Sequence, residues 1–132
     1  EELKVKNAGI GKAFLEKNAK KEGVITLSSG LQYEILLEGK GEKPKITDTV
    51  NVIYEGSLLN KNVFDSTKET GPQKMRVLQT LTGWQEALQL MPEGSRWKIY
   101  IPHDLAYGHI GAPPMIQPNS TLVFIIELLN IL

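Results

Sequence analysis

The sequence lacks several features that would assign a chemistry directly, beginning with cysteine, which is absent from all 132 residues. Its absence excludes disulfide bridges, thiolate metal ligands and thiol nucleophiles, and it leaves the redox compartment open. A long hydrophobic run is also missing. The longest apolar stretch, residues 122–132, is interrupted by Glu127 and Asn130, and it is well short of the roughly 20 residues that a membrane-spanning helix needs.

The sequence has no excess of charge of either sign, because 15 basic residues balance 15 acidic ones and the formal net charge is zero. Nucleic acids and acidic membrane surfaces are therefore disfavoured as partners, since both select an excess of positive charge. With 41% hydrophobic residues, a chain of this length suits one compact domain that buries its core without metals or disulfides.

The first 23 residues predict a helix. This stretch is rich in Lys, Glu and Ala, its apolar residues recur at roughly helical spacing, and two lysines precede Gly23. Basic residues in the last turn and a glycine after it are typical of a helix end. Gly9 and Gly11 would each cost this helix about 1 kcal/mol relative to alanine. We therefore expect it to pack against the domain or against a segment outside this chain.

After this helix the apolar period changes to two, which predicts β-strands. Polar turns at 28–30 and 60–62 separate the extended segments, and consecutive strands joined by such turns are typical of an antiparallel sheet. The segments occur at residues 24–27, 31–37, 50–54, 63–64 and around Met75 and Val77.

One short helix interrupts the strand pattern in the segment that begins at Thr82. Thr82 and Gln85 fit a capping box, and Trp84, Leu88 and Met91 share one face of the helix. A proline and a glycine follow and end it. This helix is the only element in the second half of the chain that the pattern predicts as helical.

Two further strands follow, at 96–102 and 121–129, with a loop rich in glycine and proline between them. The order of elements predicts an α+β domain over residues 24–132, in which a curled antiparallel β-sheet is wrapped over one short α-helix. The N-terminal helix of residues 1–23 precedes this domain. Because the short helix covers only part of the concave face, we expect aromatic side chains at the open end to line a pocket.

Hydrolytic, metal and phosphate chemistry find little support in the motifs. None of the serines lies in a strand-to-helix elbow. His103 and His109 lie in or beside the glycine- and proline-rich loop without a recognised ligand spacing, which favours a structural or surface role. The segment "EGKGEK" lacks the P-loop pattern and precedes a strand rather than a helix.

The aromatic residues carry more information, because they come from different predicted elements. Taken singly, each fits a hydrophobic core. However, a large ring at the start of the short helix would close the floor of a sheet cup. Asp65 is either a hydrogen-bond partner of a buried tyrosine hydroxyl or a solvated turn residue, since a carboxylate beside rings is costly unless it is hydrogen-bonded. The aromatic set is Tyr54, Phe64, Trp84, Tyr107 and Phe124.

Three stretches of the chain contain short motifs in a fixed order: "VNVIYEGSLLNKNVFDSTKETGPQKM", "LTGWQEALQLMPEGSRWKIYIPHDLAYG" and "PNSTLVFIIELLNI". Their Y-x-G, V-F-D-S, G-W-x-x-A-L, A-Y-G and T-L-V-F elements resemble the FKBP-type peptidyl-prolyl cis-trans isomerases, from about Leu31 to the last residue. The preceding helix and "GVITLSSGLQY" resemble the bacterial macrophage infectivity potentiator branch. In that branch a long helix joins the isomerase domain to an N-terminal dimerisation domain.

The resemblance implies an apolar pocket that binds a proline-containing substrate. Trp84 would form its floor. Thr80 would lie at the rim, where the family more often has an aliphatic residue, and Gln73 stands where some members have an aromatic ring. The implied walls and the rest of the rim are Tyr54, Phe64, Phe124 and Ile116.

The resemblance also implies polar contacts around the reacting bond. Asp65 would face the reacting amide and would be held by the Tyr54 hydroxyl. The Tyr107 hydroxyl would donate a hydrogen bond to the bound chain, and the backbone N–H of Leu81 would donate one to a substrate carbonyl. Asp65, Tyr107 and Tyr54 are thus the expected catalytic residues.

The activity that the resemblance implies is rotation about X–Pro peptide bonds in an apolar pocket, assisting protein folding without a cofactor or a metal. The implied partners are proline-containing peptides and unfolded client proteins, with macrolides such as tacrolimus or rapamycin as inhibitors. A proline-recognition or chaperone module with little turnover is the alternative. The two differ in whether a proline peptide is turned over or only bound.

The chain begins with Glu-Glu rather than Met, so we expect it to be a piece of a longer protein whose targeting segment lies outside it. By resemblance, residues 1–23 would be the remnant of a linker to a dimerisation domain, and the parent chain would be a homodimer. The expected location, by the same resemblance, is the bacterial cell envelope, either in the periplasm or at the outer membrane.

Overall fold

The computed structural model describes residues 2–132, which form two α-helices, seven β-strands and two short 3-10 helices. None of these helices is long and apolar enough to cross a membrane. The elements are α1 (Glu2–Asn18), β1 (Val24–Thr26), β2 (Gln32–Leu37), β3 (Thr49–Leu58), β4 (Val63–Ser66), β5 (Gln73–Arg76), η1 (Val77–Gln79), α2 (Thr82–Leu90), β6 (Arg96–Ile101), η2 (His103–Leu105) and β7 (Leu122–Ile131).

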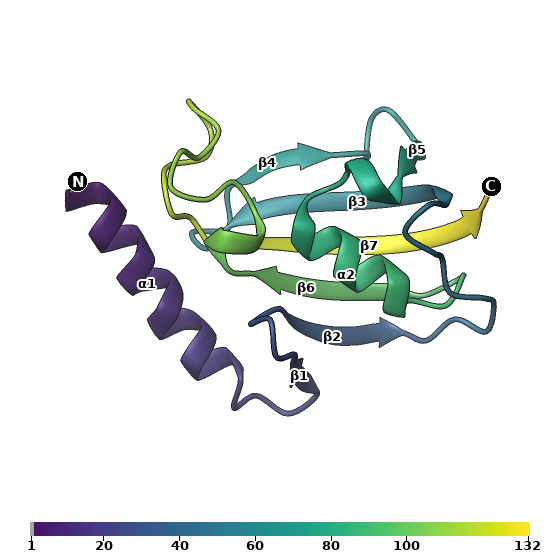
Figure 1. Cartoon of the computed structure of the whole chain (residues 1–132), viewed down its shortest axis with the longest axis horizontal. Helices are drawn as coiled ribbons and strands as arrows, with labels where there is room; N and C mark the ends of the chain where they lie inside the picture. The colour runs from purple at the N-terminus through teal and green to yellow at the C-terminus, as the bar shows by residue number, and fades with distance from the viewer. Residues whose placement is uncertain (1) are drawn as a thin grey trace.

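All the strands join one antiparallel sheet in the order β1-β2-β6-β7-β3-β4, and β5 pairs with β3 as well. Strands β5 and β4 share one edge of β3, where β5 pairs with its first half and β4 with its second. Helix α2 crosses one face of the sheet (Figure 1). The predicted α+β class, a curled antiparallel sheet over one short helix, is confirmed.

The core lies between α2 and the sheet, because each element places its apolar side chains at the period of its own geometry. Trp84, Leu88 and Met91 are buried, as their helical spacing predicts. Burying one large apolar side chain stabilises the fold by about 1.5–3 kcal/mol. On the sheet side the buried alternating residues are Val50, Val52, Trp97, Ile99, Ile101, Leu122, Phe124, Ile126 and Leu128.

The capping box predicted for the start of α2 is wrong. The N-cap is Leu81, and no side chain caps it. The Gln85 amide Nε2 instead donates to the carbonyl oxygens of Thr80 and Leu78, at 2.8 and 3.1 Å. The 3-10 turn η1 ends just before α2 and brings these carbonyls within reach. Gln85 therefore ties the beginning of the helix to the preceding turn.

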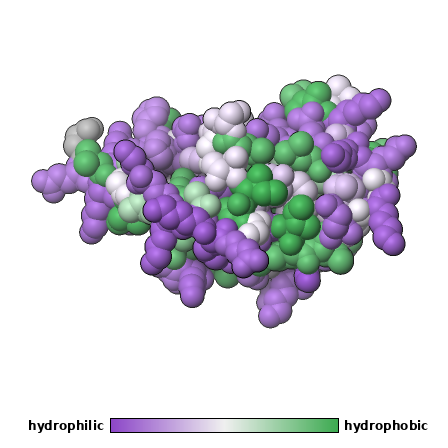
Figure 2. Space-filling view, turned by 90° about the horizontal axis from the view of Figure 1, so that it is seen from below, coloured by the Kyte–Doolittle hydropathy of each residue, from purple (hydrophilic) through white to green (hydrophobic). Residues whose placement is uncertain are grey.

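Strand β2 is less buried than its alternating pattern predicts. Tyr33 stacks on Trp97, with ring centroids 4.2 Å apart, but Ile35 and Leu37 are 38% and 54% exposed. The three-residue strand β1 pairs only with residues 32–34, so the second half of β2 is an open edge. Figure 2, seen from below the view of Figure 1, shows hydrophobic surface among hydrophilic side chains.

Helix α1 lies at one end of the sheet (Figure 1) and ends at Asn18, earlier than the predicted end near Gly23. Residues 19–23 form turns and a bend instead. The side-chain amide of Asn18 is buried and donates to Gln32 Oε1 at 2.8 Å. This hydrogen bond joins the C-terminal end of the helix to strand β2.

The domain itself is a packing partner of α1, which was one of the two expected sources of its stability. A Cβ atom built on Gly11 would collide with the Thr121 side chain, whereas one built on Gly9 meets nothing within 4 Å. The rings of Phe14 and Tyr100 lie 5.8 Å apart. Gly11 is therefore needed for close approach of the helix to the loop before β7, and Gly9 is not.

The two glycines provide a matched test of this docking. Gly9→Ala is expected to raise the free energy of unfolding by about 1 kcal/mol, because alanine favours the helix and meets no neighbour. Gly11→Ala gains the same propensity but overpacks against Thr121, and overpacking costs about 1–3 kcal/mol. Urea denaturation of both variants measures the difference. Equal stabilisation by both substitutions would contradict the docking of α1.

Candidate active site

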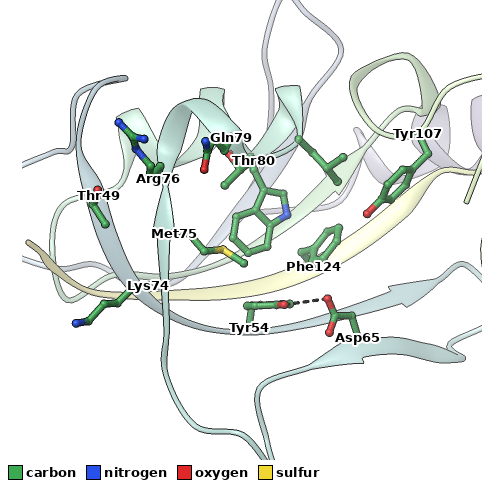
Figure 3. A pocket seen from close by; sticks show the side chains of 12 residues that line it. Thr49, Tyr54, Asp65, Lys74, Met75, Arg76, Gln79, Thr80, Tyr107 and Phe124 are labelled. Carbon is green, nitrogen blue, oxygen red and sulfur yellow. Dashed lines mark hydrogen bonds between the residues drawn. The ribbon is translucent and has the colours of Figure 1, made fainter.

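An open cavity of about 630 Å³ lies beside the start of α2, between that helix and the strands of one sheet edge. Its side chains come from β3, β4, β5, η1, α2, β7 and the loop after β6, as Figure 3 shows. The lining residues are Thr49, Tyr54, Asp65, Lys74, Met75, Arg76, Gln79, Thr80, Leu81, Trp84, Tyr107 and Phe124.

Perpendicular ring contacts build the aromatic part of the cavity. The Trp84 ring lies 5.1 Å from that of Tyr54 at an interplanar angle of 86°, and 5.2 Å from that of Phe124 at 85°. Edge-to-face pairs of this kind contribute about 0.5–1.5 kcal/mol each beyond their burial. Trp84 is only 3% exposed. The indole is thus fixed between α2 and the sheet before any ligand binds.

Gly56 makes the close packing of the neighbouring rings possible. It lies on β3 opposite Asp65 of β4 and Phe124 of β7. A Cβ atom at this position would lie 2.5 Å from Phe124 Cε1 and 2.9 Å from Phe64 Cζ. The Phe64 ring therefore packs edge-on behind Phe124, with centroids 5.5 Å apart. Sequence reasoning missed Gly56, although a glycine inside a strand pattern signals a close approach.

Asp65 joins the aromatic group through a hydrogen bond. The Tyr54 hydroxyl donates to Asp65 Oδ2 at 2.8 Å, drawn as the dashed line in Figure 3. The backbone on both sides is held as well, because Tyr54 N–H donates to Thr67 Oγ1 and Thr67 N–H donates to the Tyr54 carbonyl, both at 3.0 Å. Asp65 is exposed. It is the tyrosine partner of the first reading and is exposed to solvent, but it lies in strand β4 rather than in a turn.

The structure brings most of the predicted site residues to the cavity. Thr80, Leu81 and Tyr107 line it together with the aromatic residues and Asp65. Two predicted residues do not line it. Phe64 lies behind Phe124, and Ile116 is 3% exposed and belongs to the hydrophobic core rather than to the rim.

Several lining residues were not predicted. Met75 extends the apolar surface beyond Trp84, and Lys74 and Arg76 flank it on β5. Their positions depend on the pairing of β5 with the first half of β3, which the sequence pattern of a short strand does not specify. Thr49 and Gln79 complete this end.

Polar partners are scarce at the floor of the cavity. The Trp84 indole nitrogen is buried and has no hydrogen-bond partner. The Thr80 hydroxyl at the rim donates to the Val77 carbonyl at 2.7 Å, within its own turn. Among residues 2–132 no group of three His, Cys, Asp or Glu residues is placed to hold a metal ion. Beside the aromatic rings, the polar groups that line the cavity include the Tyr54 and Tyr107 hydroxyls and the Asp65 carboxylate.

Comparison with protein families identifies the domain. Residues 40–129 match the FKBP-type peptidyl-prolyl cis-trans isomerase model. The chain belongs to this family. Residues 1–35 match the model of the domain amino terminal to FKBP-type peptidyl-prolyl isomerases, a match that includes α1 and β1.

Relatives of this FKBP-type chain are found among bacterial proteins. The chain is 49% identical over 128 residues to the outer membrane protein MIP of Legionella longbeachae, covering 95% of this chain and 54% of that protein. It is 50% identical over 126 residues to the FKBP-type 22 kDa peptidyl-prolyl cis-trans isomerase of Escherichia coli strain K12, covering 95% and 61%. The chain thus spans about half to three fifths of these relatives.

A solved structure shows the same fold. The crystal structure of FkpA from Escherichia coli superposes with a TM-score of 0.93 at 43% sequence identity, covering 97% of this chain and 60% of that one. The likeness extends over the N-terminal helix as well as the sheet, since nearly the whole chain is covered.

Burial and the Asp65 carboxylate raise the pKa of two tyrosine hydroxyls that line the cavity. Desolvation first, then the hydrogen bond and the charge of Asp65, raise the pKa of Tyr54 to about 12. Desolvation and the charge of Asp65 also raise the pKa of Tyr107. Both shifts move ionisation further from the physiological pH range, in which an ordinary tyrosine is already protonated.

The effect of Asp65 on Tyr54 is testable by titration. Asp65→Asn removes the negative charge while burial persists, so the Tyr54 pKa is expected to fall from about 12 toward its ordinary value of 10.0. Tyr100 is the internal control, because burial and Glu34 raise its pKa to about 12 away from Asp65. NMR titration of tyrosine ring carbons measures both. A Tyr54 pKa unchanged by the substitution would show that burial alone sets it.

Proposed function

We propose that this chain catalyses cis-trans rotation about X–Pro peptide bonds and thereby assists protein folding. The observation that carries the proposal is the cavity itself, in which perpendicular rings surround a space bordered by the Tyr54–Asp65 hydrogen bond. Membership of the isomerase family supports the same activity. The reaction makes and breaks no covalent bond, so it requires neither a nucleophile nor a metal ion.

The barrier to rotation comes from amide resonance and is about 18–20 kcal/mol. For X–Pro bonds both isomers are populated, yet they interconvert over roughly tens of seconds. An apolar cavity that accepts the pyrrolidine ring replaces water around the amide and removes hydrogen bonds that stabilise the planar form. Trp84, Tyr54 and Phe124 supply such a surface. Differential binding of the twisted amide then accelerates the rotation.

The donors at the cavity hold the peptide in place while its amide turns. Tyr107 is 39% exposed, so its hydroxyl can reach a bound chain and donate a hydrogen bond to it. Leu81 is the N-cap of α2, and N–H groups at a helix start have no intrahelical acceptor. In this proposal the Leu81 N–H binds a substrate carbonyl beside the prolyl bond.

Asp65 acts in the proposed mechanism through its field and its hydrogen bond, without transferring a proton. Its carboxylate orients the Tyr54 hydroxyl at 2.8 Å and places a negative charge beside the position of the twisting amide. A fixed charge that favours the charge distribution of the twisted form over the planar one lowers the barrier. Tyr54 is in turn the residue that positions Asp65.

Proline-containing peptides and unfolded proteins are the proposed substrates, and tacrolimus or rapamycin the proposed competitors for the cavity. The relative named outer membrane protein MIP supports a location in the bacterial cell envelope, in the periplasm or at the outer membrane. The match of residues 1–35 to an amino-terminal domain model supports residues 1–23 as part of a linker to a dimerisation domain, and hence a homodimeric parent chain.

Asp65→Ala tests the proposed site. The carboxylate is exposed, so the free energy of unfolding is expected to change by less than about 1 kcal/mol. Its loss is expected to lower kcat/KM for a proline peptide about tenfold or more, equivalent to at least about 1.4 kcal/mol of transition-state stabilisation. Glu69→Ala removes another exposed acid from outside the cavity and is expected to retain full activity. A parallel loss of stability and activity in Asp65→Ala would make Asp65 a structural residue.

A further inference from the structure

The loop between β6 and β7 connects the cavity to helix α1. Tyr107 lies near its beginning and lines the cavity. Beyond it residues 108–119 form an excursion of the loop. Its two ends are joined, because Asn119 N–H donates to the Gly108 carbonyl at 2.8 Å. Within the excursion Ala112 and Ile116 form an isolated β-bridge with N–O distances of 2.8 and 3.0 Å. The excursion therefore begins and ends at Gly108 and Asn119, next to Tyr107.

Helix α1 holds the C-terminal end of this excursion by side-chain amides. Asn7 Nδ2 donates to the Pro118 carbonyl at 2.9 Å and to Gln117 Oε1 at 3.2 Å. Asn119 Nδ2 donates in the opposite direction, to the Lys4 carbonyl at 3.2 Å. Hydrogen bonds between the helix and the loop thus run in both directions: Asn7 donates from the helix to the loop, and Asn119 donates from the loop to the helix.

The spacing on α1 fits a continuous docking surface. Asn7 and Gly11 are four residues apart and lie on one face of the helix. Gly11 contacts Thr121, two residues beyond Asn119. Figure 1 shows α1 beside the loop that follows β6. The helix therefore contacts the loop over more than one turn, at residues 117–121.

The backbone of Asn119 matches this role. It has a φ of 56°, a left-handed conformation that asparagine tolerates better than most residues. This conformation lets Asn119 close the excursion through its N–H and reach α1 through its side chain. No motif of the sequence indicates either asparagine.

We propose that Asn7 and Asn119 are positioning residues, through which helix α1 fixes the loop that presents Tyr107 to the substrate. The proposal rests on the isomerase function proposed above, and it makes α1 part of the isomerase machinery rather than only a linker. Any movement of α1 relative to the sheet then alters substrate binding at Tyr107.

Two substitutions remove the side-chain carboxamides of Asn7 and Asn119 and leave the local backbone conformation accessible. Asn7→Ala improves helix propensity, so it does not weaken α1 by itself. Asn119→Gly permits the positive φ and retains the N–H that closes the loop. Lys6→Ala is the control, because Lys6 is an exposed residue of the same helix.

The first readout is amide hydrogen exchange, which requires no activity. Asn7→Ala and Asn119→Gly are expected to accelerate exchange at the Gly111 and Ile116 N–H groups at least about fivefold, equivalent to about 1 kcal/mol of lost protection. Exchange within β3 and β7 is expected to stay unchanged, as in Lys6→Ala. Unchanged exchange in the loop of both variants would overturn the proposal, whether or not the chain is an isomerase.

The second readout is a double-mutant cycle with Tyr107→Phe, using exchange of a proline peptide. Each asparagine substitution is expected to raise KM severalfold with a smaller effect on kcat in the wild-type background, and to have no further effect when Tyr107 is already phenylalanine. Independent, additive losses in the cycle would show that the asparagines do not act through Tyr107. An inactive wild-type chain would refute the proposed function, while the hydrogen-exchange result would still decide the coupling.

Discussion

The edge-to-face packing of Trp84 against Tyr54 and Phe124 is the interaction on which the site depends. It joins α2 to β3 and β7, so the same contacts that close the core also shape the cavity. The helix is only nine residues long, and its first turn supplies the ring that covers the open end of the sheet. Gly56 permits this arrangement by leaving room for the Phe124 ring on the strand beside it.

The polar residues of the site lie beside these packed aromatic rings. Tyr54 belongs to both, because its ring contacts Trp84 and its hydroxyl binds Asp65. Partial burial raises the pKa of the phenol, and Asp65 itself is exposed to solvent. A negative charge is thereby held at the edge of an aromatic surface without the cost of burying it. This combination suits the proposed role of the site in rotation about a prolyl amide bond.

Strand alternation and helix periodicity predicted the sheet, the short helix and most of their buried faces, because those patterns reflect backbone geometry directly, whereas the second half of β2 is exposed at an open edge. Trp84 and Asp65 were predicted for the cavity through family motifs. Contacts between distant segments were not predicted: a glycine within a strand signals a close approach, but which rings approach Gly56 depends on strand register, and the packing of Gly11 on Thr121 depends on where α1 docks. The capping box was wrong because the helix begins one residue earlier than expected: Leu81 is the N-cap, so Thr82 already lies within the helix.

The central claim is that the aromatic cavity accelerates rotation about a prolyl bond, and NMR exchange spectroscopy on a Leu-Pro peptide tests it most directly. The cis-trans exchange rate is measured with and without the protein, and again with tacrolimus present. The account predicts acceleration that tacrolimus abolishes. An unchanged exchange rate, with peptide resonances that still shift on binding, would contradict it and identify the domain as a proline-recognition module.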